Sequence, residues 1–440
     1  MSDATPWAGR RLHFVGIGGA GMSGLARVAR ALGAEVTGSD RAADSPYLRE
    51  AGIEVRAGHE AANVPRGAEV VVSSAIPADN VERVVARERG QSELHRAELL
   101  GEITRLRPTI AVTGTHGKTT TSSMIVHALR GVGMDPGYLV GGEVRSTGSN
   151  AGWATGEWLV VEADESDRSL LRLEPSIAVL TNAELDHHAT YASQRDVDDT
   201  FRAFVDLAEH VVLGDEPGLT RFRGSVARPE DVELEPGGVR FTLDGVPVAL
   251  PVPGVHNARN AAVALAACRL AGADLQVSAA ALADFSGAGR RFERLGVTAG
   301  GAQVVDDYAH HPTEVRATIA AARTLRPRRV VAVFQPHLFS RTRHQHREFG
   351  AALARADLVV VIDIYPARER AEDFPGITGR LVAAAAADAA EGRRVAWLPD
   401  FDAAEAFLRA ELRPGDLVLT LGAGNVDALG RRLVAPSGGV

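Results

Sequence analysis

The chain has 440 residues, too many for a single hydrophobic core, and this length predicts two or three domains. Its apolar fraction of 45% and charged fraction of 24% are those of ordinary globular proteins, and its net charge of −8 gives no electrostatic reason to expect a nucleic-acid or membrane partner. No apolar run reaches membrane-spanning length, and the first residues lack the apolar stretch of a secretory signal. The single cysteine, Cys268, excludes an intrachain disulfide. We therefore expect a reducing, cytoplasmic location.

Short β-branched segments alternate with Ala-, Leu- and Arg-rich segments of helical character along most of the chain. Several of the β-branched segments are apolar throughout, which is typical of strands that helices cover on both faces of a sheet. The pattern predicts an α/β fold with mainly parallel sheets. In chain order, the expected strands are 11–18, 34–40, 68–76, 109–115, 157–164, 176–184, 210–215, 329–336, 357–365 and 416–424.

These segments form three blocks, which predict domains at residues 1–107, 108–295 and 296–440. The second block contains a polar, β-like insertion at 231–254, and the alanine-rich run at 381–392 is expected to be a helix.

The first expected strand leads into a glycine-rich turn, FVGIGGAGMSG, and then into a helix. Gly16, Gly18 and Gly21 have the spacing of a dinucleotide-binding fingerprint, and Asp40 ends the following strand. The pattern fits NAD, but the diphosphate of a nucleotide sugar fits it equally well. The turn alone therefore predicts a diphosphate site without identifying the ligand.

The segment AVTGTHGKTTTSSM, residues 111–124, resembles a phosphate-binding loop with unusual spacing. Gly114 precedes Gly117 by three residues, whereas a standard P-loop separates its glycines by five. Lys118 is also the only lysine among the 48 basic Lys and Arg residues, which suggests a specific need for an ammonium group there. We expect Lys118 to bridge the β- and γ-phosphates of a nucleotide and Thr119 to bind Mg²⁺.

Polar clusters follow the next two expected strands, at the carboxyl ends where parallel sheets bind ligands. Carboxylates, imidazoles and hydroxyls there are suitable ligands for phosphate-bound Mg²⁺, although solvated acidic loops and helix caps would give the same pattern. The clusters are Glu162, Asp164, Glu165 and Asp167, then Asn182, Glu184, Asp186, His187 and His188.

Taken together, the motifs resemble the ATP-dependent muramyl (Mur) ligases of peptidoglycan synthesis. The resemblance is carried by eight strings in the family's order, over roughly residues 13–370: GIGGAGMSGLA, GTHGKTTT, EADESDRSLL, TNAELDHH, GVHNARNAAVALA, GAGRRFE, DDYAHHPTE and FQPHLFSRT. In this family the short glycine spacing is the normal form of the loop. The resemblance implies a Rossmann-like N-terminal domain for a UDP-linked substrate, a central P-loop-type ATPase domain, and a Rossmann-like C-terminal domain for an amino acid.

The implied reaction joins L-alanine to the muramoyl carboxylate of UDP-N-acetylmuramate through an acyl phosphate, with ATP as co-substrate and Mg²⁺, or Mn²⁺ in its place, as cofactor. The products would be UDP-N-acetylmuramoyl-L-alanine, ADP and phosphate, made in the cytoplasm by a monomer or homodimer. Three alternatives remain open: a family member that adds a preformed peptide, a nicotinamide-dependent oxidoreductase, and a non-catalytic nucleotide-binding switch.

The resemblance also implies roles for particular residues. Lys118, His310 and Arg341 are the expected catalytic residues. Contacts to ATP are expected from Gly114, Thr115, His116, Gly117, Lys118, Thr119, Thr120, Asn257, Asn260, Arg291 and Asp306. The UDP moiety would bind Gly16, Gly18, Gly19, Gly21, Asp40, Ser73 and Ser74. Tyr308, His310 and Arg341 would bind alanine, and Thr119, Glu162 and His187 would bind the metal.

His95 and Arg96, in the string SELHRAELL, are interpreted as an exposed helix face, with contact to the substrate as the alternative. Two departures from the family stand out. Leu338 occupies a position that is often basic, so the alanine carboxylate would depend more on Arg341. Because Lys118 is the only lysine, a carbamylated lysine beside the second Mg²⁺ is excluded, and an acidic group near 195–201 is expected in its place or a looser hold on the metal.

Overall fold

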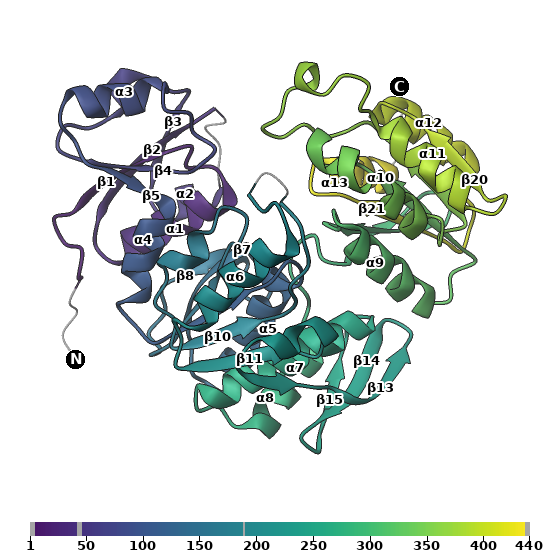
Figure 1. Cartoon of the computed structure of the whole chain (residues 1–440), viewed down its shortest axis with the longest axis horizontal. Helices are drawn as coiled ribbons and strands as arrows, with labels where there is room; N and C mark the ends of the chain where they lie inside the picture. Colours follow the sequence, from purple (N-terminus) through teal and green to yellow (C-terminus); the bar gives the residue numbers. More distant parts are fainter. Residues whose placement is uncertain (1–4, 42–45, 188–189, 436–440) are drawn as a thin grey trace. The chain divides into compact units, whose positions relative to one another are not determined.

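The computed structural model describes residues 5–41, 46–187 and 190–435 (Figure 1). The chain divides into two compact units, Met1–Pro229 with Arg259–Leu282, and Glu230–Ala258 with Ala283–Val440. Their sheets contain five, seven, three and six strands. The predicted three-domain α/β fold with mostly parallel sheets is confirmed.

The N-terminal sheet is parallel throughout, in the order β3-β2-β1-β4-β5. In β1, Phe14 joins the core that includes α1, whereas Val15 packs in a second cluster on the side of α3. The alternation of a strand therefore gives each face of this sheet its own core. The strands are β1 (Arg11–Val15), β2 (Glu35–Asp40), β3 (Glu54–Ala57), β4 (Glu69–Val72) and β5 (Glu93–His95), and the helices are α1 (Ala20–Ala31), α2 (Pro46–Glu50), α3 (Val81–Glu88) and α4 (Arg96–Thr104).

The second sheet has the order β12-β11-β10-β6-β9-β7-β8, with β8 its only antiparallel strand in the described chain. Ile110, Ala111 and Val112 of the central strand β6 are completely buried, as expected of a parallel strand covered on both faces. The strands are β6 (Thr109–Thr113), β7 (Gly137–Val144), β8 (Ser149–Gly152), β9 (Leu159–Glu162), β10 (Ile177–Leu180), β11 (His210–Gly214) and β12 (Ser225–Ala227). The helices of this part are α5 (Lys118–Gly131), α6 (Gln194–Val205), α7 (Val255–Leu270) and α8 (Leu275–Ala281).

The predicted β-like insertion is a three-stranded antiparallel sheet, β13 (Glu230–Glu235), β14 (Gly238–Leu243) and β15 (Val246–Leu250). Asp244 and Gly245 connect the last two strands with φ of 50° and 77°. Two positive φ angles at an Asp-Gly pair are characteristic of a tight hairpin turn, so this register was encoded locally.

The C-terminal sheet has the order β16-β17-β21-β18-β19-β20, and only β16 is antiparallel among its described strands. Its strands are β16 (Glu293–Val297), β17 (Gln303–Asp307), β18 (Arg329–Phe334), β19 (Leu358–Val361), β20 (Arg394–Trp397) and β21 (Asp416–Leu421). Its helices are α9 (Pro312–Thr324), α10 (Phe339–Leu353), α11 (Gly379–Ala389), α12 (Phe401–Glu411) and α13 (Val426–Val434). Helix α11 confirms the interpretation of the alanine-rich run. Strand β16 spans the predicted limit between residues 295 and 296, and the three domain limits stay predictions.

All ten expected strands are present. The remaining ordered elements are short 3-10 turns: η1 (Ala61–Asn63), η2 (Ser169–Arg172), η3 (Pro217–Arg221), η4 (Leu282–Asp284) and η5 (Ala371–Asp373). None of the helices in the described part of the chain combines the length and apolar character that a membrane crossing requires.

Candidate active site

The loop between β6 and α5 wraps so closely against its neighbours that two of its positions require glycine. Gly114 has φ of 135° and Gly117 has φ of 79°, conformations that side chains of L residues disfavour. A Cβ atom at Gly114 would lie 2.1 Å from Thr181 Oγ1, and one at Gly117 would lie 2.6 Å from Asn260 Oδ1. No described side chain caps the start of α5, which therefore offers backbone N–H groups to an anion.

The polar residues after β10 hold this loop in place. The His116 N–H donates to Asn182 Oδ1 at 2.9 Å, and the Asn182 amide donates back to the His116 carbonyl at 3.0 Å. Thr181 Oγ1 donates to the same carbonyl at 2.6 Å, and Thr115 Oγ1 donates to the Glu184 carbonyl at 2.8 Å. The loop is thus fixed by hydrogen bonds before any ligand binds.

Lys118 points back along the loop and pairs with a buried carboxylate. Its Nζ donates to the Gly114 carbonyl at 2.7 Å and lies 2.8 Å from Oε2 of Glu165, whose side chain is 3% exposed. Burial alone would lower the pKa of Lys118, but the charges of Glu165, Glu162 and Asp164 outweigh it and raise that pKa. The only lysine of the chain is therefore fully charged at neutral pH.

Two of the three expected metal ligands meet at the end of β9. Thr119 Oγ1 donates to Glu162 Oε2 at 2.9 Å, and the Gly141 N–H donates to the same oxygen at 2.8 Å. A Cβ atom at Gly141 would lie 2.8 Å from Glu162 Oε1, so a glycine is needed to let β7 approach the carboxylate. Oxygen ligands of this kind fit Mg²⁺.

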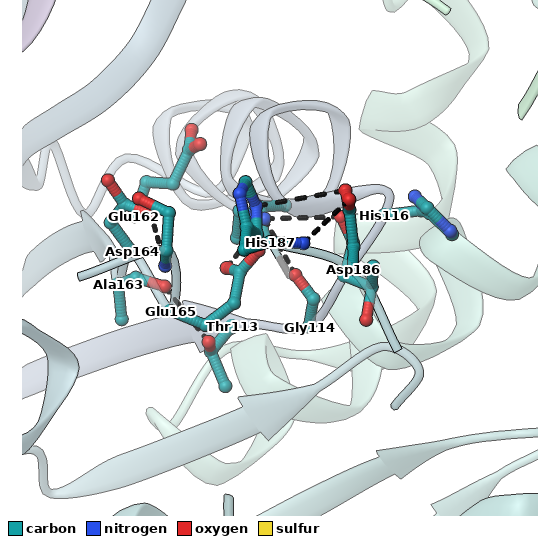
Figure 2. A network of polar contacts seen from close by, with 12 residues as sticks. Thr113, Gly114, His116, Glu162, Ala163, Asp164, Glu165, Asp186 and His187 are labelled. Atoms are coloured by element: carbon teal, nitrogen blue, oxygen red, sulfur yellow. Dashed lines mark hydrogen bonds and ion pairs between the residues drawn. The ribbon is translucent and has the colours of Figure 1, made fainter. Parts of the chain in front are cut away.

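The third expected ligand, His187, contacts a different carboxylate in the same cluster. Its Nε2 lies 3.2 Å from Glu165 Oε1 and 3.8 Å from Asp186 Oδ2 (Figure 2). Glu165 therefore stands between Lys118 and His187. The sequence showed Glu165 in the string EADESD, but its neighbours there gave no reason to rank it above the other acids. His188 lies outside the described residues.

The expected replacement acid near 195–201 is not placed beside this cluster. Asp196 accepts from the backbone at the start of α6, Asp198 pairs with Arg221, and Asp199 pairs with Arg202. No described contact joins these aspartates to the Thr119–Glu162 pair.

The glycine-rich turn lies at the carboxyl ends of β1 and β2, as expected. Gly16 has φ of 76°, its N–H donates to the Ser39 carbonyl, and Gly19 directly precedes α1. The Gly18 N–H donates to Asp40 Oδ2 at 2.9 Å, and a Cβ at Gly18 would lie equally close to that oxygen. Asp40 therefore contacts the turn directly.

The segment after β4 and the start of α4 complete this edge of the sheet. Ser73 is half-buried, whereas the Ser74 hydroxyl donates to Asp167 at 3.4 Å. His95 accepts from the Ala97 N–H and caps α4. The interpretation of Arg96 as part of an exposed face was wrong, because its guanidinium pairs with Asp164 and Asp167.

In the second unit, the three residues expected to bind alanine lie close together. The rings of Tyr308 and His310 are 5.3 Å apart, and His310 lies 6.2 Å from the ring of His337. Arg341 on α10 is 5% exposed, and its Nη1 lies 3.3 Å from His337 Nδ1. His337 also stacks on Tyr365 with 5.9 Å between ring centroids.

His337 and Tyr365 were not assigned from the sequence. His337 lies in the string FQPHLFSRT, directly after the expected strand 329–336, and Tyr365 ends the expected strand 357–365. The carboxyl ends of these two strands were the available signal that the two residues lie side by side. Leu338 is buried with φ of 70°, so the position that is often basic in the family holds a packed apolar side chain here.

The other residues expected to contact ATP differ in their surroundings. Asn260 lies over Gly117, whereas the Asn257 amide donates to the Pro253 carbonyl at 2.8 Å. Arg291 lies 5.1 Å above the ring of Tyr308. Asp306 is completely buried, and its two oxygens accept from Arg290 and Thr420. Its expected contact to ATP stays a prediction.

Comparisons with known proteins agree along the whole chain. Three family models match successive segments: "Mur ligase family, catalytic domain" at residues 11–107, "Mur ligase middle domain" at 112–268, and "Mur ligase, glutamate ligase domain" at 290–424. The chain is 45% identical to UDP-N-acetylmuramate–L-alanine ligase of Thermobifida fusca, over 97% of each chain, and 44% identical to that of Streptomyces coelicolor, over 99% of each. Among solved structures, the UDP-N-acetylmuramate-alanine ligase of Thermotoga maritima matches with a TM-score of 0.82 and 28% identity, over 96% of this chain and 98% of the other.

Proposed function

The chain belongs to the Mur ligase family, and we propose that it joins L-alanine to the carboxylate of UDP-N-acetylmuramate while ATP is converted to ADP and phosphate. The observation that carries the substrate assignment is the 45% identity to the Thermobifida fusca L-alanine ligase, which extends over 97% of both chains. The reaction belongs to peptidoglycan precursor synthesis, and its need for ATP and a UDP-linked substrate supports a cytoplasmic location.

The chemistry requires activation of a poor electrophile. One carboxylate oxygen of the muramoyl group attacks the γ-phosphorus of ATP, ADP leaves, and an acyl phosphate forms. The amine of L-alanine then attacks the acyl carbon, loses a proton, and the tetrahedral intermediate expels phosphate. The enzyme forms no covalent bond in this sequence, so its contribution is positioning and charge neutralisation.

The phosphate loop supports the first step. Its glycines let the backbone approach the phosphates, and the charged Lys118 would move from Glu165 to the oxygens between the β- and γ-phosphorus atoms. Because the lysine is buried and charged, it would stabilise the extra charge of the transition state without first shedding water.

The Thr119–Glu162 pair fits a magnesium ion, which would neutralise phosphate charge when bound. Glu162 is held by the Gly141 N–H, so its orientation does not depend on the ion. His187, which contacts Glu165, would be the third ligand of this ion.

Alanine recognition is assigned to the second unit. Arg341, which is buried and contacts His337, would pair with the carboxylate of the amino acid. Tyr308 and His310 would enclose its methyl and amine groups. The UDP diphosphate would bind the Gly16–Gly21 turn at the start of α1.

The test measures phosphate release from Mg²⁺-ATP with UDP-N-acetylmuramate, in the presence and absence of L-alanine. We expect release only when both substrates are present, and a Lys118→Ala variant should be slower by about 100- to 1000-fold or more. Release that requires a preformed peptide instead of L-alanine would refute the substrate but not the ligase class. Absence of release with every amine tested would refute the proposed reaction.

A further inference from the structure

Arg96 lies between the five-stranded and the seven-stranded sheet of the first unit, and the proposed reaction gives it no role. It is the first residue of α4, directly after β5, and therefore lies at the carboxyl edge of the N-terminal sheet. His95 caps the helix, and the Glu98 side chain accepts from the His95 N–H at 2.9 Å. Because both ends of this capping arrangement are satisfied, the backbone of Arg96 is fixed.

The guanidinium is held at one end by the acidic segment that follows β9. Arg96 Nη2 lies 3.0 Å from Asp164 Oδ2 and 2.9 Å from Asp167 Oδ2, and the arginine side chain is only 20% exposed. Because two carboxylates accept hydrogen bonds from the same Nη2 atom, the guanidinium cannot rotate freely.

The other end of the guanidinium reaches the glycine-rich turn. A Cβ atom at Gly21, in the first turn of α1, would lie 3.5 Å from Arg96 Nη1. A Cβ atom at Gly16 would instead meet Ile76, one at Gly18 would meet Asp40, and one at Gly19 would meet only backbone. Arg96 is therefore the one cation among these described neighbours. Both hydrogen bonds from Arg96 to the aspartates leave from Nη2, so they do not occupy Nη1.

The local charge makes a cation necessary if a diphosphate binds there. Asp40 contacts the Gly18 N–H directly, and Asp164 and Asp167 lie on the far side of Arg96. Without Arg96, a diphosphate on this turn would face three carboxylates with only the helix N-terminus to offset them. A guanidinium can serve both sides because its donors point in fixed, separate directions.

We propose that Arg96 binds the diphosphate of the UDP-linked substrate through Nη1 while Asp164 and Asp167 hold the other end of its guanidinium. The inference rests on the proposed function, since it requires a nucleotide diphosphate on the Gly16–Gly21 turn. It adds a positioning role, because the same aspartates belong to the segment that carries Glu162 and Glu165. Arg96 thereby fixes the UDP-linked substrate relative to the phosphate loop.

The experiment compares wild type, Arg96→Lys and Arg96→Gln by isothermal titration calorimetry with UDP-N-acetylmuramate, UDP, uridine and ADP. Loss of one charge-assisted hydrogen bond predicts about 10- to 100-fold weaker binding of both UDP-N-acetylmuramate and UDP to Arg96→Gln. Binding of uridine, which lacks phosphate, and of ADP, which uses the phosphate loop, should change less than about twofold. Arg96→Lys keeps the positive charge but lacks the planar, two-armed geometry of the guanidinium. Its affinity for UDP and UDP-N-acetylmuramate should lie between those of wild type and Arg96→Gln.

Two variants serve as matched controls. Asp167→Asn keeps Arg96 but removes one anchor, and it should weaken UDP binding less than Arg96→Gln does. Arg105→Ala removes an arginine at the other end of α4, which pairs with exposed Glu174, and it should change no affinity.

The remaining outcomes separate the inference from the proposed function. Weaker binding of UDP-N-acetylmuramate with unchanged binding of UDP would overturn the diphosphate contact and assign Arg96 to the muramoyl group. Equal losses for UDP and ADP would overturn it as well, because they would indicate a structural role. If wild type binds neither UDP nor UDP-N-acetylmuramate, the proposed function itself fails.

Discussion

Glu82 offers a quantitative test of how the N-terminal domain is stabilised. This carboxylate on α3 is completely buried beneath the sheet, where Ser39 Oγ donates to it at 2.5 Å and Asn63 Nδ2 at 2.8 Å. His13 Nε2 and His59 Nδ1 each lie 3.6 Å from its Oε2. Burial alone would raise the pKa of Glu82, but the contacts with His13, Ser39 and Asn63 outweigh it and lower that pKa from 4.5 to about 2.

The shift in pKa sets the magnitude and the sign of the effect. Each pKa unit corresponds to about 1.4 kcal/mol, so the ionised carboxylate contributes about 3 kcal/mol to the free energy of unfolding at pH 7. Because the folded pKa is depressed, this contribution is complete above pH 4.5 and is lost as the pH falls towards 2. At pH 3.5 about 2 kcal/mol should remain.

Replacing the carboxylate by its amide isolates this term. We expect Glu82→Gln to be less stable than wild type by at least about 3 kcal/mol at pH 7, and the difference should shrink by about 1 kcal/mol at pH 3.5. The amide adds a donor that faces Asn63, but this cost does not change with pH.

The assay must report on the domain that contains Glu82. Hydrogen exchange along a urea series, followed by mass spectrometry of peptides covering β1 and α3, gives the local free energy of unfolding. Wild type and variant are compared at the same pH, so the intrinsic exchange rates cancel. Glu88→Gln, an exposed site at the end of the same helix, is the control and should behave as wild type. A difference that is independent of pH, or below about 1 kcal/mol at pH 7, would refute the reasoning.

Three further predictions follow from single contacts. Glu162→Gln should raise the Mg²⁺ concentration for half-maximal phosphate release by about tenfold or more, and an unchanged Mg²⁺ titration would exclude Glu162 as a ligand. Gly114→Ala should strain the loop by about 1–3 kcal/mol, because its φ is 135° and the new Cβ would meet Thr181; calorimetry should show weaker ADP binding, and wild-type affinity would contradict the loop geometry. Arg329→Ala should lower the free energy of unfolding of the second unit by about 2–3 kcal/mol, since it leaves Asp416 buried without its partner, and hydrogen exchange of β18 that matched wild type would contradict this.

The predicted strands differ in composition from two of the strands that were missed, β5 and β8. Runs such as Val70–Val72 and Leu358–Val361 are apolar and β-branched, so a few adjacent residues identify them. Strands β5 and β8, with the sequences ELH and SNAG, are short and polar. They are strands only because a neighbouring strand offers them hydrogen-bonding partners, which a local pattern does not reveal.

The candidate site divides in the same way. The glycines and Lys118 of the phosphate loop are neighbours in the chain, and their spacing after a strand predicts the loop without further information. The metal prediction was harder, because which acid meets which base depends on strand order. Glu162 and Glu165 are three residues apart, yet one meets Thr119 and the other meets Lys118 and His187.

By itself, the sequence determined the α/β class, the ten expected strands, the glycine-rich turn and the phosphate loop. These features rest on interactions within a few residues: side-chain periodicity, positive φ at glycine and a helix start after a strand. Only the tertiary structure decided the partners of Arg96, which lie 68 and 71 residues away, and the stacking of His337 on Tyr365. The physical reason is that the carboxyl ends of parallel strands lie side by side, and the order of the strands in the sheet differs from their order in the chain. Charged side chains from distant parts of the sequence therefore meet at this edge, and no local pattern connects them.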